Sequence, residues 1–204
     1  LIRKNLMSSK RQSPQLSHPP KQGLYDPAQE HDSCGVGFLV NMKGVPSRDI
    51  VQGALEICVK LDHRGGCGCD LNTGDGAGML MQMPHKFFAT IALELDIQLP
   101  APGHYSVGIV FLSPDEESAA TEQQVLNDAI LEFGQTLLGW RDLPFDNHDL
   151  GQASADSEPR MRQVFIGRSP DLEDEAAFER ALYLIRRVST SRLRYLQGEA
   201  PHYF

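Results

Sequence analysis

The residues best suited to chemistry begin at Cys34, which opens the small-then-apolar run Cys34-Gly35-Val36-Gly37-Phe38-Leu39-Val40. Such a run predicts the start of a buried strand. The thiol can attack the carbonyl of Ser33, so we expect self-removal of residues 1–33 as a leader. The freed α-amine of Cys34 would have a pKa of about 7.7 to 8.0 and could deprotonate its own thiol. The pattern therefore predicts a nucleophile that cuts an amide bond without a separate catalytic histidine.

Two other segments supply groups that could surround this thiol. Arg64, in His63-Arg64-Gly65, is predicted to be a cation that orders the nucleophile strand, although a surface charge at a helix end is the alternative. Gly35 leaves room for a close-packed substrate. Thr73 and Asp75, in the Gly-rich run 73–78, are predicted to support the site from its edge. A phosphate-binding loop is disfavoured there because Asp75 would repel phosphate and a predicted strand follows.

Two alternatives remain open from the residues alone. Cys34 could be an inert core thiol in a non-catalytic fragment, since burial is the usual environment of a free cysteine. His63, Cys67 and Cys69 could instead be metal ligands, but Cys-x-Cys is not the usual zinc spacing and no second cysteine pair exists.

Composition limits the classes of partner and environment. The 204 residues suffice for one core, and a hydrophobic content of 41% is ordinary for a globular protein. A net charge of −8 argues against nucleic acid as a partner. Cysteines at 34, 58, 67 and 69 form no regular disulfide framework, so we expect a reducing compartment. No apolar stretch reaches the roughly 18 residues of a membrane span, and no secretory signal is recognisable.

Hydrophobic periodicity predicts a mixture of helices and strands. The polar residues 1–23 are predicted to be disordered. A helix capped by Ser47 is expected to bury Val51, Ala54, Leu55, Cys58 and Leu61. Strands are expected at 34–42, 77–83, 105–112 and 164–166, with further helices from 84 through Phe87, Ile91 and Leu95, from 115 to 133 and around 178–188, and a loop at 142–160. The mixture favours stacked sheets covered by helices.

Several segments resemble the glutamate synthase large-subunit family, at the start of its class II glutamine amidotransferase domain. They are Cys34 to Phe38, His63 to Cys69 and Asn72 to Met79. Leu24 to Pro27 and the region from Asp146 to Phe165 also resemble this family in their order and spacing. The longer Cys-Gly-Cys version of the middle segment is similar to this family rather than to related amidotransferases.

The resemblance implies an α+β fold, a four-layer αββα sandwich of the N-terminal-nucleophile hydrolase type, over residues 34–204. It implies that Cys34 attacks the side-chain amide of glutamine and that the ammonia passes to synthase domains further along the polypeptide. Those domains would aminate 2-oxoglutarate reductively with FMN and an iron–sulfur cluster, and neither cofactor is expected within this chain. The electron donor and a small reductase subunit stay open, and the expected location is the cytoplasm, or an organelle in a plant or alga.

Two features of the family pattern are missing from these residues. The sequence has no Asn-Gly pair, which the resemblance implies as the oxyanion hole, and no Arg-aromatic-Ser-Thr stretch for the substrate carboxylate. Because one oxyanion donor alone is worth about a hundred- to a thousandfold in rate, we expect a C-terminally truncated domain that is inactive by itself.

Overall fold

A three-stranded antiparallel sheet organises the larger part of the molecule. The computed structural model describes residues 21–24, 26, 35–65, 74 and 76–197. In the sheet, β3 (Arg160–Gly167) lies between β1 (Tyr105–Leu112) and β2 (Thr136–Asp142). β1 has its predicted bounds and β3 extends the predicted strand at both ends. β2 is not predicted because a register shift between Leu137 and Gly139 interrupts the alternation of side chains that identifies a strand.

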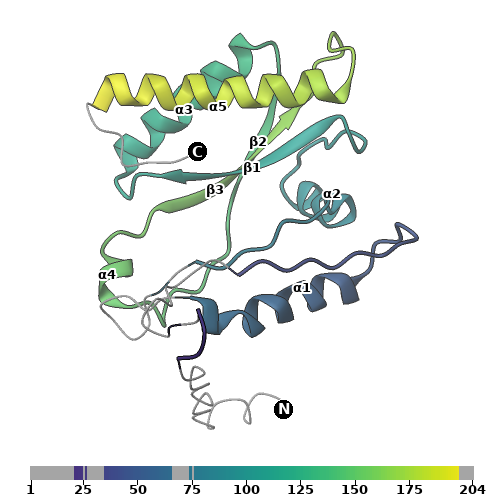
Figure 1. The fold of residues 1–204 in the computed structure, drawn as a ribbon. Coiled ribbons are helices and arrows are strands. Elements are labelled where there is room, and N and C mark those ends of the chain that lie inside the picture. The colour runs from purple at the N-terminus through teal and green to yellow at the C-terminus, as the bar shows by residue number, and fades with distance from the viewer. Residues whose placement is uncertain (1–20, 25, 27–34, 66–73, 75, 198–204) are drawn as a thin grey trace, which may run out of the picture.

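Two long helices cover one face of this sheet (Figure 1), as the periodicity predicts. α3 (Glu116–Glu132) begins at Asp115, whose side chain accepts the N–H of Ser118 at 2.8 Å, a hydrogen bond that lowers the pKa of this carboxyl group. α5 (Glu175–Gln197) has buried residues at helical spacing, so one stripe faces the sheet. The shared core consists of Val110, Leu112, Ala119, Leu126, Ala129, Ile130, Val164, Ile166, Phe178 and Ile185.

The other face of the sheet receives α2 (His85–Glu94), at the place where a helix is predicted after Pro84. Phe88 meets Phe165 of β3 edge to face, with ring centroids 5.7 Å apart, and both side chains are buried. Phe88 and Ala92 are the buried residues of this helix, whereas Phe87 and Leu95 are 51% and 41% exposed.

The third part consists of α1 (Arg48–Lys60), the 3-10 turn η2 (Asp62–Arg64) and the extended residues 35–42, which run beside α1 in Figure 1. The predicted strands at 34–42 and 77–83 are wrong for their described residues, which belong to no ladder. Alternating apolar residues need a neighbouring backbone to become a strand, and residues 35–42 lie against a helix instead. Their other face is uncovered, and Val36, Phe38 and Met42 are 88%, 88% and 98% exposed.

These elements agree with the α+β class, but a four-layer sandwich is not established. The described residues contain one sheet rather than two. The predicted loop at 142–160 contains the short helix α4 (Gln152–Ala155). Most of the predicted leader, residues 1–20, 25 and 27–33, lies outside the described residues. Among the helices that the structure describes, none is long and apolar enough to span a membrane.

Candidate active site

The described part of the chain contains two of the predicted site residues, Gly35 and Arg64. Cys34, Thr73 and Asp75 lie outside the described residues. The roles of all five therefore stay predictions, and the geometry concerns the elements on either side of them.

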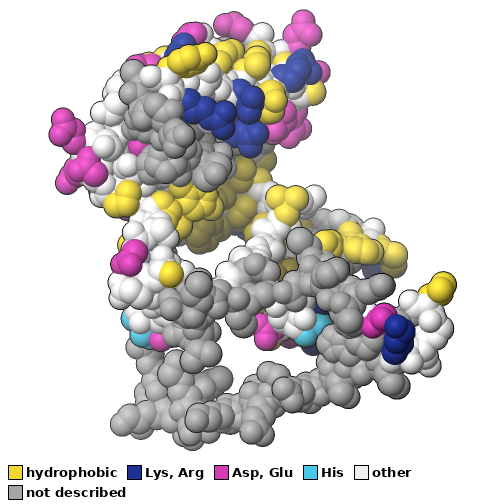
Figure 2. All heavy atoms as spheres, turned by 60° about the vertical axis from the view of Figure 1, so that its left-hand side comes forward, with side chains coloured by type: hydrophobic (Ala, Val, Ile, Leu, Met, Phe, Trp, Pro, Cys, Tyr) yellow, Lys and Arg dark blue, Asp and Glu magenta, His cyan; other side chains and the backbone are white. Residues whose placement is uncertain are grey.

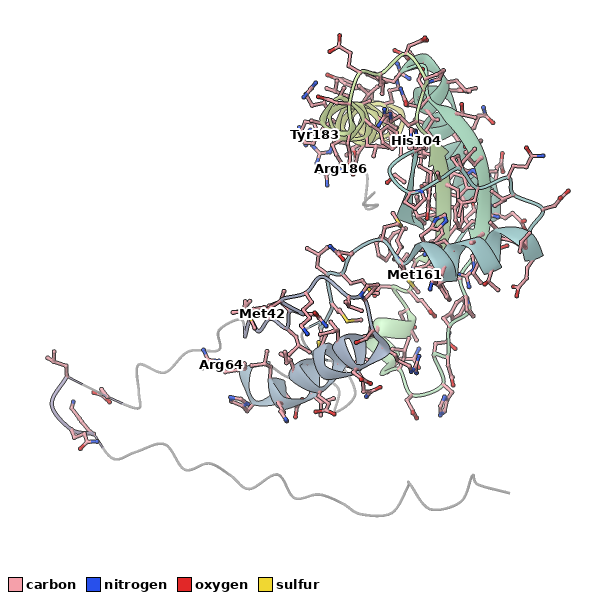
Figure 3. The ribbon with its side chains drawn as sticks, turned by 90° about the vertical axis from the view of Figure 1, so that its right-hand side faces the viewer. Met42, Arg64, His104, Met161, Tyr183 and Arg186 are labelled. Atoms are coloured by element: carbon pink, nitrogen blue, oxygen red, sulfur yellow. The ribbon has the colours of Figure 1, made fainter. Side chains whose placement is uncertain are left out.

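Arg64 is positioned by the way α1 ends. The helix begins at Ser47, whose hydroxyl accepts the N–H of Ile50 at 3.4 Å, and its C-cap is Leu61. The chain then tightens into η2, where the Arg64 N–H donates to the Leu61 carbonyl at 2.8 Å. The Gly65 N–H donates to the Asp62 carbonyl at 3.1 Å and closes the turn. These bonds place Arg64 one turn beyond the end of α1, in the part of the molecule that also contains Met42 (Figure 3).

The backbone that follows Cys34 lies directly against this helix end. A methyl group at Gly35 would be 2.8 Å from Leu61 Cδ2 and 3.3 Å from Arg64 Cβ. The first of these distances is shorter than side-chain carbons normally adopt, so glycine lets the backbone approach this closely without displacing Leu61. The structure therefore brings together Gly35 and Arg64, which are separated by 29 residues in the sequence.

The same helix also contacts the end of the Gly-rich run. The Sγ of Cys58 lies 3.6 Å from the Gly78 carbonyl, a weak hydrogen bond in which the thiol donates. Cys58 is half-buried rather than a core residue, and Leu55, predicted on the buried face, is 45% exposed. Ile57 takes the place of Leu55 on the packed face because the extended residues 35–42 cover that side of α1. One helix thus touches both predicted site segments.

The described residues offer no support for the metal alternative. Nδ1 of His63 lies 2.9 Å from the Lys60 carbonyl, a local contact within the turn. No group of three His, Cys, Asp or Glu side chains in the described part of the chain could hold a metal ion. Cys67 and Cys69 are outside the described residues.

An open cavity of about 420 Å³ lies elsewhere, between α2 and the residues that follow it. Its lining includes His85, Asp96 and Gln98. His85 Nδ1 is 3.0 Å from the hydroxyl group of Tyr105, and burial raises the pKa of this phenol, which favours its protonated form. None of the residues that line this cavity belongs to the 35–65 segment or to the Gly-rich run, so the cavity is not the predicted glutamine site.

Sequence reasoning missed Leu39, Gly53 and Ile57 in the contact between residues 35–39 and α1. Ile57 packs on Gly37, and Leu39 packs on Gly53. A signal for this contact was available, because Gly35 and Gly37 are two residues apart while Gly53, Ile57 and Leu61 are four apart. These spacings select one face of an extended segment and one face of a helix.

Comparison with known proteins gives consistent relatives. The chain is 45% identical over 169 residues to the glutamate synthase (NADPH) large chain of Bacillus subtilis, covering 83% of this chain and 11% of that one. It is 37% identical to the glutamate synthase (NADH) of Saccharomyces cerevisiae, covering 86% and 8%. It is 33% identical to the ferredoxin-dependent glutamate synthase 1, chloroplastic/mitochondrial, of Arabidopsis thaliana, covering 86% and 11%. The chain thus spans about a tenth of the length of these relatives.

The family model described as glutamine amidotransferases class-II matches residues 34–204. The match begins at the predicted nucleophile and includes every described element from α1 to α5. By this match, the chain belongs to the class-II glutamine amidotransferases.

Proposed function

We propose that this chain is the glutamine-hydrolysing part of a glutamate synthase. The observation that carries the proposal is the family match that starts at Cys34, in a chain whose next residue, Gly35, packs beside Arg64. The substrate is glutamine, and the products are glutamate and ammonia. In this proposal the ammonia reacts with 2-oxoglutarate in the synthase domains of the same polypeptide, which assimilates ammonia into glutamate.

The reaction follows from an N-terminal cysteine. The α-amine of Cys34 takes the thiol proton, and the thiolate attacks the side-chain carbonyl carbon of glutamine. The tetrahedral oxyanion collapses, the carbon–nitrogen bond breaks, and the nitrogen leaves as ammonia with the proton held by the amine. Water then attacks the γ-glutamyl thioester and gives one proton to the amine. The carbon–sulfur bond breaks, glutamate is released, and the thiolate recovers its proton.

Supporting roles fall to the residues around Cys34. Arg64 orders the nucleophile segment from the turn after α1, and Gly35 allows that segment to lie close to the helix. Thr73 and Asp75 support the site from the Gly-rich run. The oxyanion donors come from an Asn-Gly pair outside residues 1–204, because this sequence contains none. The finer fold that accompanies these roles is the four-layer αββα sandwich over residues 34–204.

Maturation belongs to the same proposal. The Cys34 thiol attacks the Ser33 carbonyl, the peptide bond is replaced by a thioester, and water releases residues 1–33. This step creates the free α-amine that glutamine hydrolysis needs.

FMN and an iron–sulfur cluster are cofactors of the synthase part. No step of glutamine hydrolysis uses them. The electron donor differs among the relatives, which are named for NADPH, NADH and ferredoxin, and a small reductase subunit is a further candidate partner. The proposed location is the cytoplasm, or an organelle if the source is a plant or alga.

The decisive variant is Cys34→Ala in the complete enzyme. We expect it to abolish glutamine-dependent glutamate synthesis, since no nucleophile remains, and to leave ammonia-dependent synthesis unchanged. Mass spectrometry should show residues 1–33 still attached to the variant and absent from the active wild type.

Two results would contradict the proposal. One is unchanged use of glutamine by the Cys34→Ala variant. The other is a wild-type thiol that does not react with a diazo-ketone analogue of glutamine, which would favour a non-catalytic domain. Stoichiometric zinc, found by elemental analysis together with either result, would favour the metal alternative.

A further inference from the structure

Three pairs of residues join the extended segment 35–39 to one face of α1, and each pair combines a glycine with a large side chain. Gly35 lies against Leu61, and Gly37 lies against Ile57. In the third pair the sizes are reversed, because Gly53 of the helix lies against Leu39 of the extended segment. The extended segment and the helix run in opposite directions along this contact.

The contacts are so close that a methyl group at any of the three glycine positions would have to displace the side chain opposite to it. A methyl group at Gly37 would be 2.5 Å from Ile57 Cγ2, and one at Gly35 would be 2.8 Å from Leu61 Cδ2. A methyl group at Gly53 would be 2.6 Å from Leu39 Cδ2. Non-bonded carbon atoms prefer separations of about 3.5 to 4.0 Å, so each glycine accommodates the side chain opposite to it.

The spacing of the pairs matches the geometry of the two elements. Two residues of an extended chain rise about 6.6 Å, and four residues of an α-helix rise about 6.0 Å. Positions 35, 37 and 39 therefore stay opposite positions 61, 57 and 53 over the whole contact.

Other alignments of the segment are disfavoured. A shift by two residues in one direction would set Leu39 against Ile57, where the present spacing does not admit even a methyl group. The opposite shift would set Ser33 against Leu61, where glycine now lies. A shift by one residue would turn Val36 and Phe38 toward the helix. The order of small and large residues thus selects one register.

We propose that this register is a positioning device that fixes Gly35, the residue directly after Cys34 in the sequence, beside the turn carrying Arg64, with Gly37 and Ile57 as positioning residues. The inference rests on the proposed role of Cys34 as nucleophile. Cys34 precedes the Gly35–Leu61 pair, and Arg64 follows Leu61 by three residues on a hydrogen-bonded turn. A slip by two residues would move the thiol about 6.6 Å along the helix. Misplacement by about 1 Å can already lower a rate by roughly a hundredfold.

A rescue experiment in the complete enzyme tests the register. Gly37→Ala places a methyl group against Ile57 Cγ2, and we expect glutamine-dependent kcat to fall by about a hundredfold while KM and ammonia-dependent synthesis change little. Ile57→Ala removes Cγ2, so the double variant should recover to the kcat of Ile57→Ala alone. Ile57→Val retains an equivalent methyl group, so Gly37→Ala combined with it should stay impaired.

Gln52→Ala is the matched control on α1. The Gln52 side chain is exposed and belongs to none of the three pairs, so kcat should stay close to the wild-type value. A second variant, Leu39→Ala, introduces no clash and therefore avoids misfolding through overpacking. It should lower glutamine-dependent kcat by a smaller factor than Gly37→Ala. In both impaired variants, inactivation by a glutamine diazo-ketone should slow, whereas thiol alkylation by iodoacetamide should persist.

The register proposal is overturned if Gly37→Ala keeps wild-type kcat, or if Ile57→Val rescues it as well as Ile57→Ala does. It is also overturned if each of the variants Leu39→Ala and Gly37→Ala loses ammonia-dependent activity by the same factor as glutamine-dependent activity. A general loss of structure would then be the cause. Any of these results is compatible with loss of activity in Cys34→Ala. Failure of the register and failure of the proposed function are therefore separable.

Discussion

Glu122 is a completely buried carboxyl group in α3, far along the chain from the candidate site. Its Oε2 accepts the backbone N–H of Ser113 at 2.7 Å. Ser113 follows the last residue of β1, so this hydrogen bond satisfies a buried donor where the strand ends. A polar residue inside a helix face can thus act as part of the core because its partner is a backbone group.

Truncation of this residue should be costly. Glu122→Ala leaves the Ser113 N–H buried without this acceptor, and we expect a loss of about 1–3 kcal/mol in unfolding free energy. Glu122→Gln keeps a carbonyl acceptor and should lose less. Chemical denaturation of the three proteins measures the difference.

The exposed Glu117, five residues earlier in α3, is the control for this prediction. Its replacement by alanine should cost less than about 1 kcal/mol, because it contributes mainly through the helix dipole. Equal losses at positions 117 and 122 would show that the buried hydrogen bond has no special importance.

At the scale of elements, α2 depends on one aromatic contact with the sheet. Phe88 is buried against Phe165, whereas its neighbour Phe87 is half exposed beneath the Arg141 guanidinium group, 5.8 Å from the ring centroid. Of these two adjacent phenylalanines, Phe88 therefore packs in the interior, whereas Phe87 makes a contact at the surface.

Phe88→Ala should lower the unfolding free energy by about 3–5 kcal/mol, through lost burial and the cavity left on the sheet. Phe87→Ala should lower it by about 1 kcal/mol or less, since an exposed cation–π contact is weak. Thermal or urea unfolding compares the two variants, and hydrogen exchange of the α2 amides shows whether the helix detaches first. Similar effects of both substitutions would disprove the assigned orientation of α2.

At the scale of the whole molecule, apolar side chains remain uncovered in the described structure. Figure 2 shows apolar side chains on the underside of the helix-and-sheet body, facing the part that contains α1. Val36, Phe38 and Met42 are exposed on the extended segment, and Leu80 is exposed after the Gly-rich run. Exposed apolar side chains gathered in this way indicate an interaction surface or a tendency to aggregate.

Residues 1–204 produced by themselves should therefore bind a hydrophobic dye and hydrolyse glutamine poorly. We expect a rate at least about a hundredfold below that of the complete enzyme, because the sequence contains no Asn-Gly pair to stabilise the oxyanion. The Cys34→Ala form of the same residues gives the background rate. Glutaminase activity equal to that of the complete enzyme would contradict this prediction.

The sequence by itself determined the longer helices α1, α2, α3 and α5, the strand at 105–112 and the family. Helical periodicity needs only local residues, and the motif around Cys34 is contiguous, so both can be recognised without a partner. It did not fully determine the packed face of α1, where Ile57 takes the place of Leu55.

Only the tertiary structure decided what the apolar segments pair with. Residues 35–42 have the alternation of a strand, yet they pack on α1, because the contact of glycines with Ile57 and Leu61 depends on a helix that follows in the chain. The same alternation of side chains is compatible with pairing to another strand or with packing on a helix, and the neighbouring element decides between them. The proximity of Gly35 to Arg64 likewise arises from the turn at the end of α1, which brings distant parts of the chain into contact.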